Sequence, residues 1–327
     1  MALTFEYFNG NDEEWDEFVL NRSMNGTFLQ TRKFINYHPT DRFKDRSICV
    51  RKGNELVATI MGCEVDDEGR TFFAHKGSTF GGITISSKIY SASAINELME
   101  GFEEFVRADG FEHVYLKMVP SVYQKKDTSL LDYFLYKDGY KGFSELNYYM
   151  HLDRYREDVI AQFSSSKRRD YRYSLKNNLQ FKKLETREEI AEYYGVLLKN
   201  LQKLGLHAVH SLEDLYDLKF NRFDDRIGFY GVYLEDKLIA SSMIFEFDGK
   251  IYHTQYLSSD EEYLELYPMD FLIENLLQTA VDNGMDTFTF GICTEDQGRY
   301  LNLGLSRFKE GFGTEFCINY SYEKYLK

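Results

Sequence analysis

The sequence predicts a mixed α/β (α+β) protein of two tandem domains, each a mostly antiparallel mixed sheet flanked by helices. The chain has 327 residues, 43% of them hydrophobic, which is enough for two cores of ordinary size. An antiparallel meander followed by a long helix and a buried strand can be read twice. Residues 137–140 (Lys-Asp-Gly-Tyr) and Asn147-Tyr148 recur as residues 309–312 (Lys-Glu-Gly-Phe) and Asn319-Tyr320. Two copies of one supersecondary unit explain this recurrence better than coincidence does.

In the first half, alternating apolar residues predict strands, and apolar residues three and four apart predict helices. The predicted order is a helix capped by Asn11 or Asp12, a short helix ended by Pro39, strands over 47–50, 56–65 and 71–75, a helix over 91–108, a strand over 114–118, a helix over 130–136 and a strand over 146–152. The domain boundary is expected near Leu152, which gives domains 1–152 and 153–327.

The second half repeats this order after two additional helices. The predicted elements are helices over 154–163 and 187–204, strands over 227–233, 238–247 and 251–257, a helix over 270–283 and a strand over 287–291. A polar loop, a short helix and a last strand follow.

Charge and cysteine usage limit the possible partners and compartment. The formal net charge of −14 opposes general affinity for DNA or for an anionic membrane, so we expect no DNA partner. The apolar runs are too short and too charged to span a bilayer, and the N-terminus lacks signal-peptide features. The four cysteines lie in predicted strands without metal-ligand spacing. We therefore expect a cytoplasmic protein with reduced thiols and no metal.

Three stretches carry a family resemblance: residues 26–32 (Gly-Thr-Phe-Leu-Gln-Thr-Arg), 166–172 (Ser-Lys-Arg-Arg-Asp-Tyr-Arg) and 307–313 (Arg-Phe-Lys-Glu-Gly-Phe-Gly). With the repeat, their order resembles the Gcn5-related N-acetyltransferase (GNAT) superfamily over nearly the whole chain. Specifically, it looks like the tandem members related to the Fem-like (FemAB/FemX) peptidoglycan aminoacyltransferases. The resemblance implies transfer of an acyl group from a thioester or ester to an amine, in cell-envelope biosynthesis, with two GNAT-like domains facing each other across a cleft.

Three residues in the second half are candidates for catalysis. Acyl transfer needs a group that accepts the ammonium proton and groups that stabilise developing charge. Glu295 and Asp296 follow the second buried strand and are candidates for the base or for amine positioning; the alternative is that they cap the next helix. Lys309 matches the lysine that lies at the acyl-transfer centre of Fem-like enzymes. Lys137 occupies the equivalent position in the first half. The alternative is therefore that a lysine at this turn recurs with the fold and has no catalytic role.

A basic segment is the candidate for acceptor binding. It consists of Lys167, Arg168, Arg169, Arg172, Lys176, Lys182 and Lys183. The guanidinium forks of Arg168, Arg169 and Arg172 suit phosphate oxygens. In Fem-like proteins the corresponding segment contacts the diphosphate of a nucleotide-linked acceptor. The resemblance therefore implies a phosphate-bearing acceptor, such as a nucleotide-linked amino sugar or wall precursor; the alternative is a solvated basic face.

Five further residues are weaker candidates. Gln30, Arg32 and His38 are assigned to the acceptor cleft. His75 and His253 lie on corresponding predicted strands. They are candidates for proton carriers, and the alternative is that each is hydrogen-bonded within its sheet.

The acyl donor has alternatives. The superfamily implies acetyl-coenzyme A or another acyl-coenzyme A. Its usual Gln/Arg-x-x-Gly-x-Gly/Ala loop, which holds the pyrophosphate on backbone N–H groups, is missing before both long helices. Aminoacyl-tRNA, the donor of several Fem-like enzymes, is the runner-up. A tandem protein that binds a nucleotide-linked ligand without catalysis is the third possibility.

Overall fold

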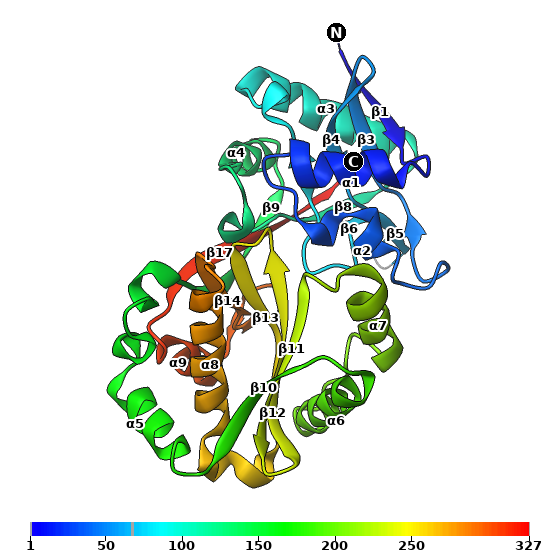
Figure 1. Cartoon of the computed structure of the whole chain (residues 1–327). Helices are drawn as coiled ribbons and strands as arrows, with labels where there is room; N and C mark the ends of the chain where they lie inside the picture. The colour runs from blue at the N-terminus through cyan, green and yellow to red at the C-terminus, as the bar shows by residue number, and fades with distance from the viewer. Residues whose placement is uncertain (1, 67–68, 327) are drawn as a thin grey trace. The chain divides into compact units, whose positions relative to one another are not determined.

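The chain forms two compact units in the computed structural model, which describes residues 2–66 and 69–326 (Figure 1). Unit 1 contains the residues up to Glu145 and those from Cys317 onward, and unit 2 runs from Leu146 to Phe316. The predicted fold class is confirmed, with mixed, mostly antiparallel sheets flanked by helices in both units. The division into GNAT-like domains 1–152 and 153–327 stays a prediction.

Unit 1 is built on two groups of strands. One sheet has the order β1 (Leu3–Tyr7), β3 (Ile48–Lys52), β4 (Glu55–Ile60) and β7 (Ile83–Ile85). The other strands follow in the order β17 (Glu315–Tyr325), β8 (His113–Lys117), β6 (Arg70–Ala74), β5 (Cys63–Asp66) and β2 (Lys44–Asp45). The helices are α1 (Asp12–Glu17), α2 (Arg32–Ile35), α3 (Ala92–Ala108) and α4 (Ser129–Lys137).

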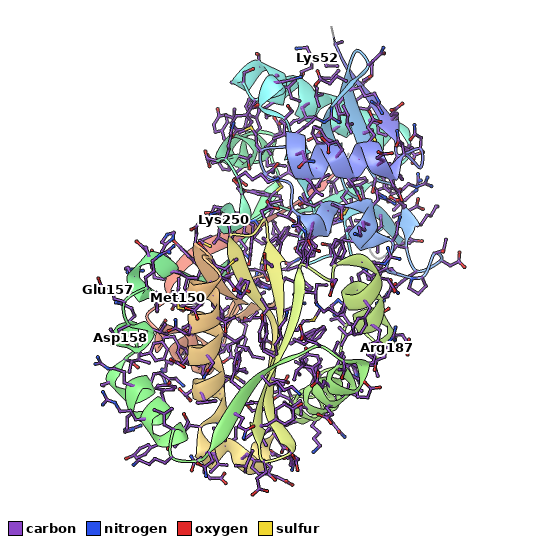
Figure 2. The ribbon with its side chains drawn as sticks, viewed as in Figure 1. Lys52, Met150, Glu157, Asp158, Arg187 and Lys250 are labelled. Carbon is purple, nitrogen blue, oxygen red and sulfur yellow. The ribbon has the colours of Figure 1, made fainter. Side chains whose placement is uncertain are left out.

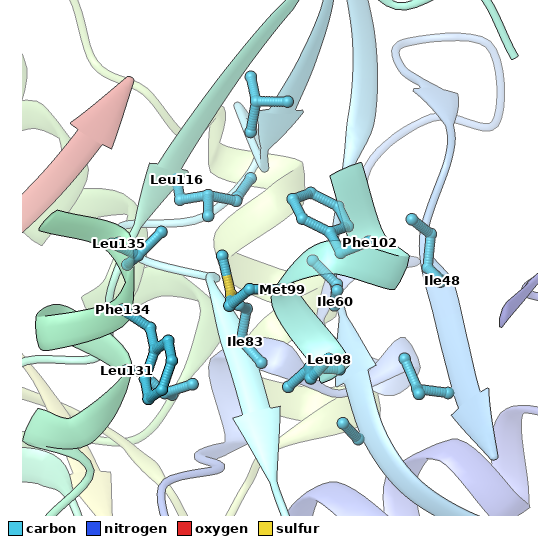
Figure 3. Packing of buried hydrophobic residues seen from close by; sticks show 14 of the residues in the cluster. Ile48, Ile60, Ile83, Leu98, Met99, Phe102, Leu116, Leu131, Phe134 and Leu135 are labelled. Carbon is cyan, nitrogen blue, oxygen red and sulfur yellow. The ribbon is translucent and has the colours of Figure 1, made fainter. Parts of the chain in front are cut away.

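Helix α3 covers the core of unit 1 with one apolar face. Ser91 caps it by accepting from the N–H of Ala94. The buried residues Ile95, Leu98, Met99, Phe102 and Val106 recur at helical spacing. They pack on strand residues that include Ile48, Ile60 and Leu116, as Figure 3 shows.

The predicted strand over 56–65 is two strands in the structure, because the chain leaves one sheet after Ile60 and enters the other at Cys63. A Cβ at the intervening Gly62 would lie 2.2 Å from the Phe72 ring. This close approach requires glycine, and it marks the crossing point.

Unit 2 is one sheet with helices on both faces. The strand order is β10 (Leu179–Leu184), β11 (Ile227–Leu234), β12 (Lys237–Phe247), β13 (Ile251–Ser259), β14 (Thr287–Ile292) and β9 (Lys141–His151). The helices are α5 (Ser165–Ser174), α6 (Arg187–Lys203), α7 (Leu212–Tyr216), α8 (Pro268–Asp282) and α9 (Leu303–Glu310). In Figure 1, α8 and α5 lie on one side of this sheet and α6 on the other. Before α9, β15 (Thr294–Glu295) and β16 (Tyr300–Leu301) form a small hairpin.

Two predicted elements of unit 2 differ. The predicted helix over 154–163 is a pair of 3₁₀ turns, Leu152–Tyr155 and Val159–Gln162. The lysines at 182 and 183, predicted to belong to the basic segment, lie on the edge strand β10. Charged side chains are typical of edge strands, where they discourage pairing with another chain. The charge of these two residues alone does not indicate a strand, so β10 was not predicted.

Strands β13 and β14 separate after a short parallel contact, and this opening positions the candidate site. They pair only over Ile251–His253 and Thr287–Thr289, although β13 continues to Ser259 and β14 to Ile292. The pairing of β13 with β12 skips Gln255, and that of β14 with β9 skips Phe290. Such bulges bend a strand and redirect its side chains.

Candidate active site at the end of strand β14

Lys309 points from α9 towards the end of β14. Asn302 caps α9 by accepting from the N–H of Leu305 at 3.0 Å, which sets the start of the helix. The Lys309 Nζ donates to the carbonyl oxygens of Gly291 at 3.0 Å and Ile292 at 2.6 Å. Burial lowers the pKa of Lys309 to about 8, with the side chain only 3% exposed. The ammonium is therefore the main form at pH 7.

A hydrogen-bonded cluster lies beside this lysine. The hydroxyls of Tyr148 and Ser306 are 2.7 Å apart, and both lie 2.9 Å from Oε1 of Glu310. Burial raises the pKa of Tyr148 to about 12, so its hydroxyl stays protonated at neutral pH. The Lys309 Nζ lies 5.9 Å from the centre of the Tyr148 ring. None of these three residues is among the candidates predicted from the sequence, although Tyr148 belongs to the recurring Asn-Tyr motif.

His253 lies on β13 next to Gly291. A Cβ on Gly291 would come within 3.1 Å of the His253 Cε1. Burial, followed by the charge of Lys309, lowers the pKa of His253 to about 3. Burial likewise lowers the pKa of His75 to about 4. Both rings are neutral at pH 7, which disfavours protonated carriers at these positions.

Glu295 and Asp296 lie in the exposed β15–β16 hairpin, where Asp296 has φ 48°. The alternative that they cap the next helix is wrong, because Asn302 is the cap of α9. Among the residues that the structure describes, no hydrogen bond or ion pair joins either carboxylate to Lys309. The structure therefore buries Lys309 inside unit 2 and leaves Glu295 and Asp296 in solvent. The two carboxylates follow, by a few residues, the backbone carbonyls to which Lys309 donates.

The basic segment divides into internal and external cations. The Lys167 Nζ lies 2.7 Å from Asp270 Oδ1 and 4.6 Å from the centre of the Phe308 ring, so Lys167 joins α5 to α8. Arg169 pairs with its neighbour Asp170 at 3.0 Å. Figure 2 shows the acidic residues before this helix, Glu157 and Asp158, at the outer surface.

The other two guanidinium groups of α5 remain available. Arg168 is half-buried and Arg172 is exposed, and neither guanidinium group has a hydrogen bond or ion pair within residues 2–66 and 69–326. They are four residues apart and so share one face of the helix.

The first turn of α8 is where a coenzyme A pyrophosphate would need backbone N–H groups. Pro268 at its first position has no N–H, and Tyr267 before it has φ 56°. Asp270 places a buried carboxylate at the positive end of the helix, where Lys167 neutralises it. These residues do not fit a pyrophosphate.

The three candidates from the first half are engaged in the fold of unit 1. Gln30 caps its own turn with Thr27 and donates to the Gly81 carbonyl at 2.8 Å. Arg32 is buried in an ion pair with Asp45. The His38 Nε2 lies 2.8 Å from the Gly77 carbonyl. None of the three is brought to the end of β14 by a described contact.

The structure also bears on metal binding, on the state of the cysteines and on membrane crossing. Across residues 2–66 and 69–326, no three His, Cys, Asp or Glu side chains are grouped to hold a metal ion. The four cysteines are free thiols. In the same ranges, no helix combines the length and apolar character needed to cross a bilayer.

Comparisons with known proteins agree with this architecture. Residues 165–310 match the family model described as "Acetyltransferase (GNAT) domain". An uncharacterized N-acetyltransferase of Bacillus pumilus is 32% identical over 74 residues, which are 23% of this chain and 45% of that protein. YlbP of Bacillus subtilis, also named an uncharacterized N-acetyltransferase, is 31% identical over 74 residues, 23% of this chain and 44% of YlbP. The chain thus spans about half the length of the curated relatives it matches.

Solved structures share the fold over the whole chain. FemX superposes with a TM-score of 0.71 at 15% identity, covering 98% of this chain and 97% of FemX. A tandem GNAT protein from the clavulanic acid biosynthesis pathway has a TM-score of 0.61 at 12% identity, covering 100% and 99%. The C-terminal domain of an Agrobacterium fabrum protein, named as a lysylphosphatidylglycerol synthetase, has a TM-score of 0.62 at 13% identity, covering 95% and 90%. The predicted resemblance is confirmed at the level of the fold.

Proposed function

Because this chain is a tandem protein of the GNAT fold, we propose that it is an N-acyltransferase. It moves an acyl group, of the acetyl type, to an amine of a phosphate-bearing acceptor such as a nucleotide-linked sugar or cell-wall precursor. The observation that carries this proposal is the buried ammonium of Lys309, hydrogen-bonded to the carbonyls of Gly291 and Ile292 where β13 and β14 separate. The acetyltransferase domain match over residues 165–310 includes this lysine.

The chemistry at this site follows from the charges of its side chains. Attack of the amine on the acyl carbonyl develops negative charge on the carbonyl oxygen, which a fixed cation stabilises in a desolvated site. Lys309 supplies that cation and also fixes the end of β14. Glu295 and Asp296, exposed on the adjoining hairpin, accept the proton of the incoming amine or position it. Tyr148, held protonated by burial, donates a proton to the leaving group.

The acceptor is held by its phosphate on α5. Arg168 and Arg172 present two guanidinium groups on one face, and Arg169 can join them by leaving its exposed pair with Asp170, which costs little. Lys167 does not bind the phosphate itself, because it already pairs with Asp270; it stabilises the fold around the site instead. The relatives named FemX and lysylphosphatidylglycerol synthetase support a role in the cell envelope. The free thiols support the cytoplasm as the compartment.

The first turn of α8 limits which molecule can carry the acyl group. The GNAT domain match favours an acyl-coenzyme A donor, but the first turn of α8 does not fit its pyrophosphate. The same misfit favours aminoacyl-tRNA as the alternative donor, and a binding protein without catalysis as the second alternative.

One set of assays separates these functions. Purified protein is supplied with a nucleotide-linked amino sugar and, in separate reactions, with acetyl-coenzyme A or aminoacyl-tRNA, and acylated sugar is measured by mass spectrometry. We expect product with one donor, and loss of product with Lys309→Ala at a temperature where circular dichroism shows that the variant is folded. Binding of the sugar with no product from either donor would reject catalysis.

A further inference from the structure

Unit 2 contains a pocket that the proposed reaction does not use. Its volume is about 420 Å³, and it lies between the strands β10 to β13 and the last turn of α8. Tyr252 in its lining is near the start of β13 and pairs with Phe288 near the start of β14. Lys309 binds the carbonyls at the other end of β14. Because β13 and β14 are parallel, the pocket and the candidate active site lie at opposite ends of this pair of strands.

Strand register gathers the lining of the pocket on one face of the sheet. Side chains directly opposite each other in an antiparallel pair point to the same face. Glu246 on β12 is opposite Tyr252 on β13, so their Cβ atoms lie about 4.5–5.5 Å apart. Ile244, two residues before Glu246, is opposite Gly228 on β11. Gly228 has no side chain, and a Cβ there would lie 2.8 Å from the Tyr230 ring, so glycine keeps this space open.

Aromatic rings and hydroxyl groups line the pocket, and contacts within unit 2 hold them in place. The Phe181 and Tyr230 rings stack with their centres 5.7 Å apart and their planes 8° apart. Asn283 donates to the Tyr252 hydroxyl at 2.7 Å. Thr279 Oγ1 donates to a carbonyl of its own helix at 2.7 Å, so its lone pairs can accept from an N–H donor. The lining therefore combines aromatic surface with hydrogen-bond acceptors.

Glu246 brings a carboxylate into this pocket. The side chain is half-buried, and neither carboxylate oxygen has a hydrogen bond or ion pair with the residues that the structure describes. Both oxygens keep accessible surface, so a ligand in the pocket can reach them. Burial raises the pKa of this carboxyl, although the charges of Arg226 and Lys183 act in the opposite direction. The carboxylate is therefore partly desolvated without a partner of its own, and a cation in contact with it would offset that cost.

The other charges around the pocket also favour a cationic ligand. The three cations of the lining each pair with a different carboxylate: Lys183 with Glu185 at 3.1 Å, Lys219 with Asp224 at 3.0 Å and Arg226 with Asp248 at 3.4 Å. Asp225 and Glu246 add two more carboxylates to the lining. Five carboxylates therefore surround the pocket against three cations, and an anionic ligand would be repelled.

We propose that this pocket binds a small organic ammonium ion, whose N–H groups donate to the Glu246 carboxylate and whose apolar body contacts the Phe181 and Tyr230 rings. Aromatic faces attract ammonium groups, and a charge-assisted hydrogen bond to a carboxylate is stronger than one between neutral groups. The site lies at the end of β13 and β14 that is remote from Lys309. The proposal does not rest on acyl transfer, so it and the proposed function can fail separately.

Binding is tested on the full chain without an acyl donor, with the δ1 methyl groups of isoleucine labelled by ¹³C and followed by NMR. Ile244 lines the pocket and reports on it, and Ile48 in the core of unit 1 is the reference. Three probes of similar size are compared: benzylamine, which is an ammonium ion at pH 7, neutral benzyl alcohol and anionic benzoate. We expect benzylamine to shift the Ile244 resonance in a saturable way and to leave that of Ile48 in place. Benzyl alcohol should bind about tenfold more weakly or worse, and benzoate should not bind.

Variants tie the binding to Glu246. Glu246→Gln keeps the shape of the side chain and removes its charge, and it should weaken benzylamine binding about tenfold or more. The variant should fold, because a carboxylate whose pKa is raised by burial opposes folding when it is charged. Asp225→Asn is the matched control, since it removes an equal charge from the same lining. That side chain is 81% exposed, so its loss should weaken binding by less than about threefold.

Three outcomes would overturn the proposal. The first is equal affinity for benzylamine and benzyl alcohol, or preferential binding of benzoate. The second is an unchanged affinity in Glu246→Gln, or equal losses in Glu246→Gln and Asp225→Asn, which would assign the effect to net charge alone. The third is an Ile244 resonance that no probe shifts, which would leave a pocket that holds solvent only.

Discussion

The Nζ of Lys309 lies 3.0 Å from the carbonyl oxygen of Gly291, so the last helix of unit 2 is joined to the end of its buried strand. Gly291 adopts φ +71°, a conformation that other residues rarely adopt. This backbone conformation and the hydrogen bond together fix the strand end where β13 and β14 separate. We therefore expect both residues to be sensitive to substitution.

The charge of Lys309 should control the pH dependence of the reaction. Its pKa is lowered to about 8, so the cation is lost above that pH. We expect the turnover of the wild type to fall relative to Lys309→Arg as the pH rises from 7 to 9.5, because arginine stays protonated. Steady-state rates across this range measure the ratio. A constant ratio would show that the cation is not needed.

Gly291→Ala should reduce acyl transfer about tenfold or more, because misplacing a catalytic group by about 1 Å has effects of that order. The added Cβ would lie 3.1 Å from His253 and would adopt a disfavoured φ. Gly284→Ala is the matched control, since Gly284 has the same φ of +71° with nothing within 4 Å of the added Cβ. Both variants should lose about 1–2 kcal/mol of stability, but only Gly291→Ala should lose turnover. Equal turnover in the two variants would contradict the role of the strand end.

Lys167 and Asp270 should behave as a structural ion pair. Lys167→Met leaves the carboxylate of Asp270 buried without its partner and should cost about 3–5 kcal/mol in urea unfolding. The double variant with Asp270→Asn should recover part of this loss. Arg172→Met, an exposed cation on the same helix, should change stability by less than about 0.5 kcal/mol. A loss for Lys167→Met no greater than that control would reject the pair as structural.

Arg168 and Arg172 should determine acceptor affinity without affecting stability. Each change to Ala should weaken binding of a nucleotide-linked amino sugar by about 10- to 100-fold, the value of a charge-assisted hydrogen bond. Calorimetric titration at low and high salt should show a smaller salt dependence in the variants. Glu157→Ala, in the exposed stretch before α5, is the control that should not weaken binding. Unchanged affinity in Arg168→Ala and Arg172→Ala would move the acceptor site elsewhere.

His253 should make the fold sensitive to acid. Its pKa is about 3 in the folded state, against about 6.5 in the unfolded state. The unfolded chain therefore binds the proton first, and stability is lost as the pH falls from 6.5 towards 3. His253→Gln should reduce the slope of unfolding free energy against pH in this window, by up to about 1.4 kcal/mol per unit. The exposed His207→Gln should leave the slope unaltered, and an unaltered slope in His253→Gln would contradict the assignment.

The candidate site was only partly predictable from the sequence. Lys309 could be selected because it belongs to a recurring Lys-Asp/Glu-Gly motif, and that signal is local. Tyr148 could not be selected, because its contact with Glu310 depends on the pairing of β9 with β14. Lys167 was predicted to bind phosphate, since its sequence neighbours are arginines. In the structure it turns inward, because α5 packs on α8 and brings it to Asp270.

By itself, the sequence determined the order of strands and helices and their duplication, because apolar periodicity and turn residues act over a few neighbours. Only the tertiary structure decided which side chains contact one another within the core of each unit. It assigned the residues from Cys317 onward to unit 1 and separated β13 from β14 beyond their short parallel contact. Strand register and helix packing join residues far apart in the chain, and local periodicity does not encode those partners.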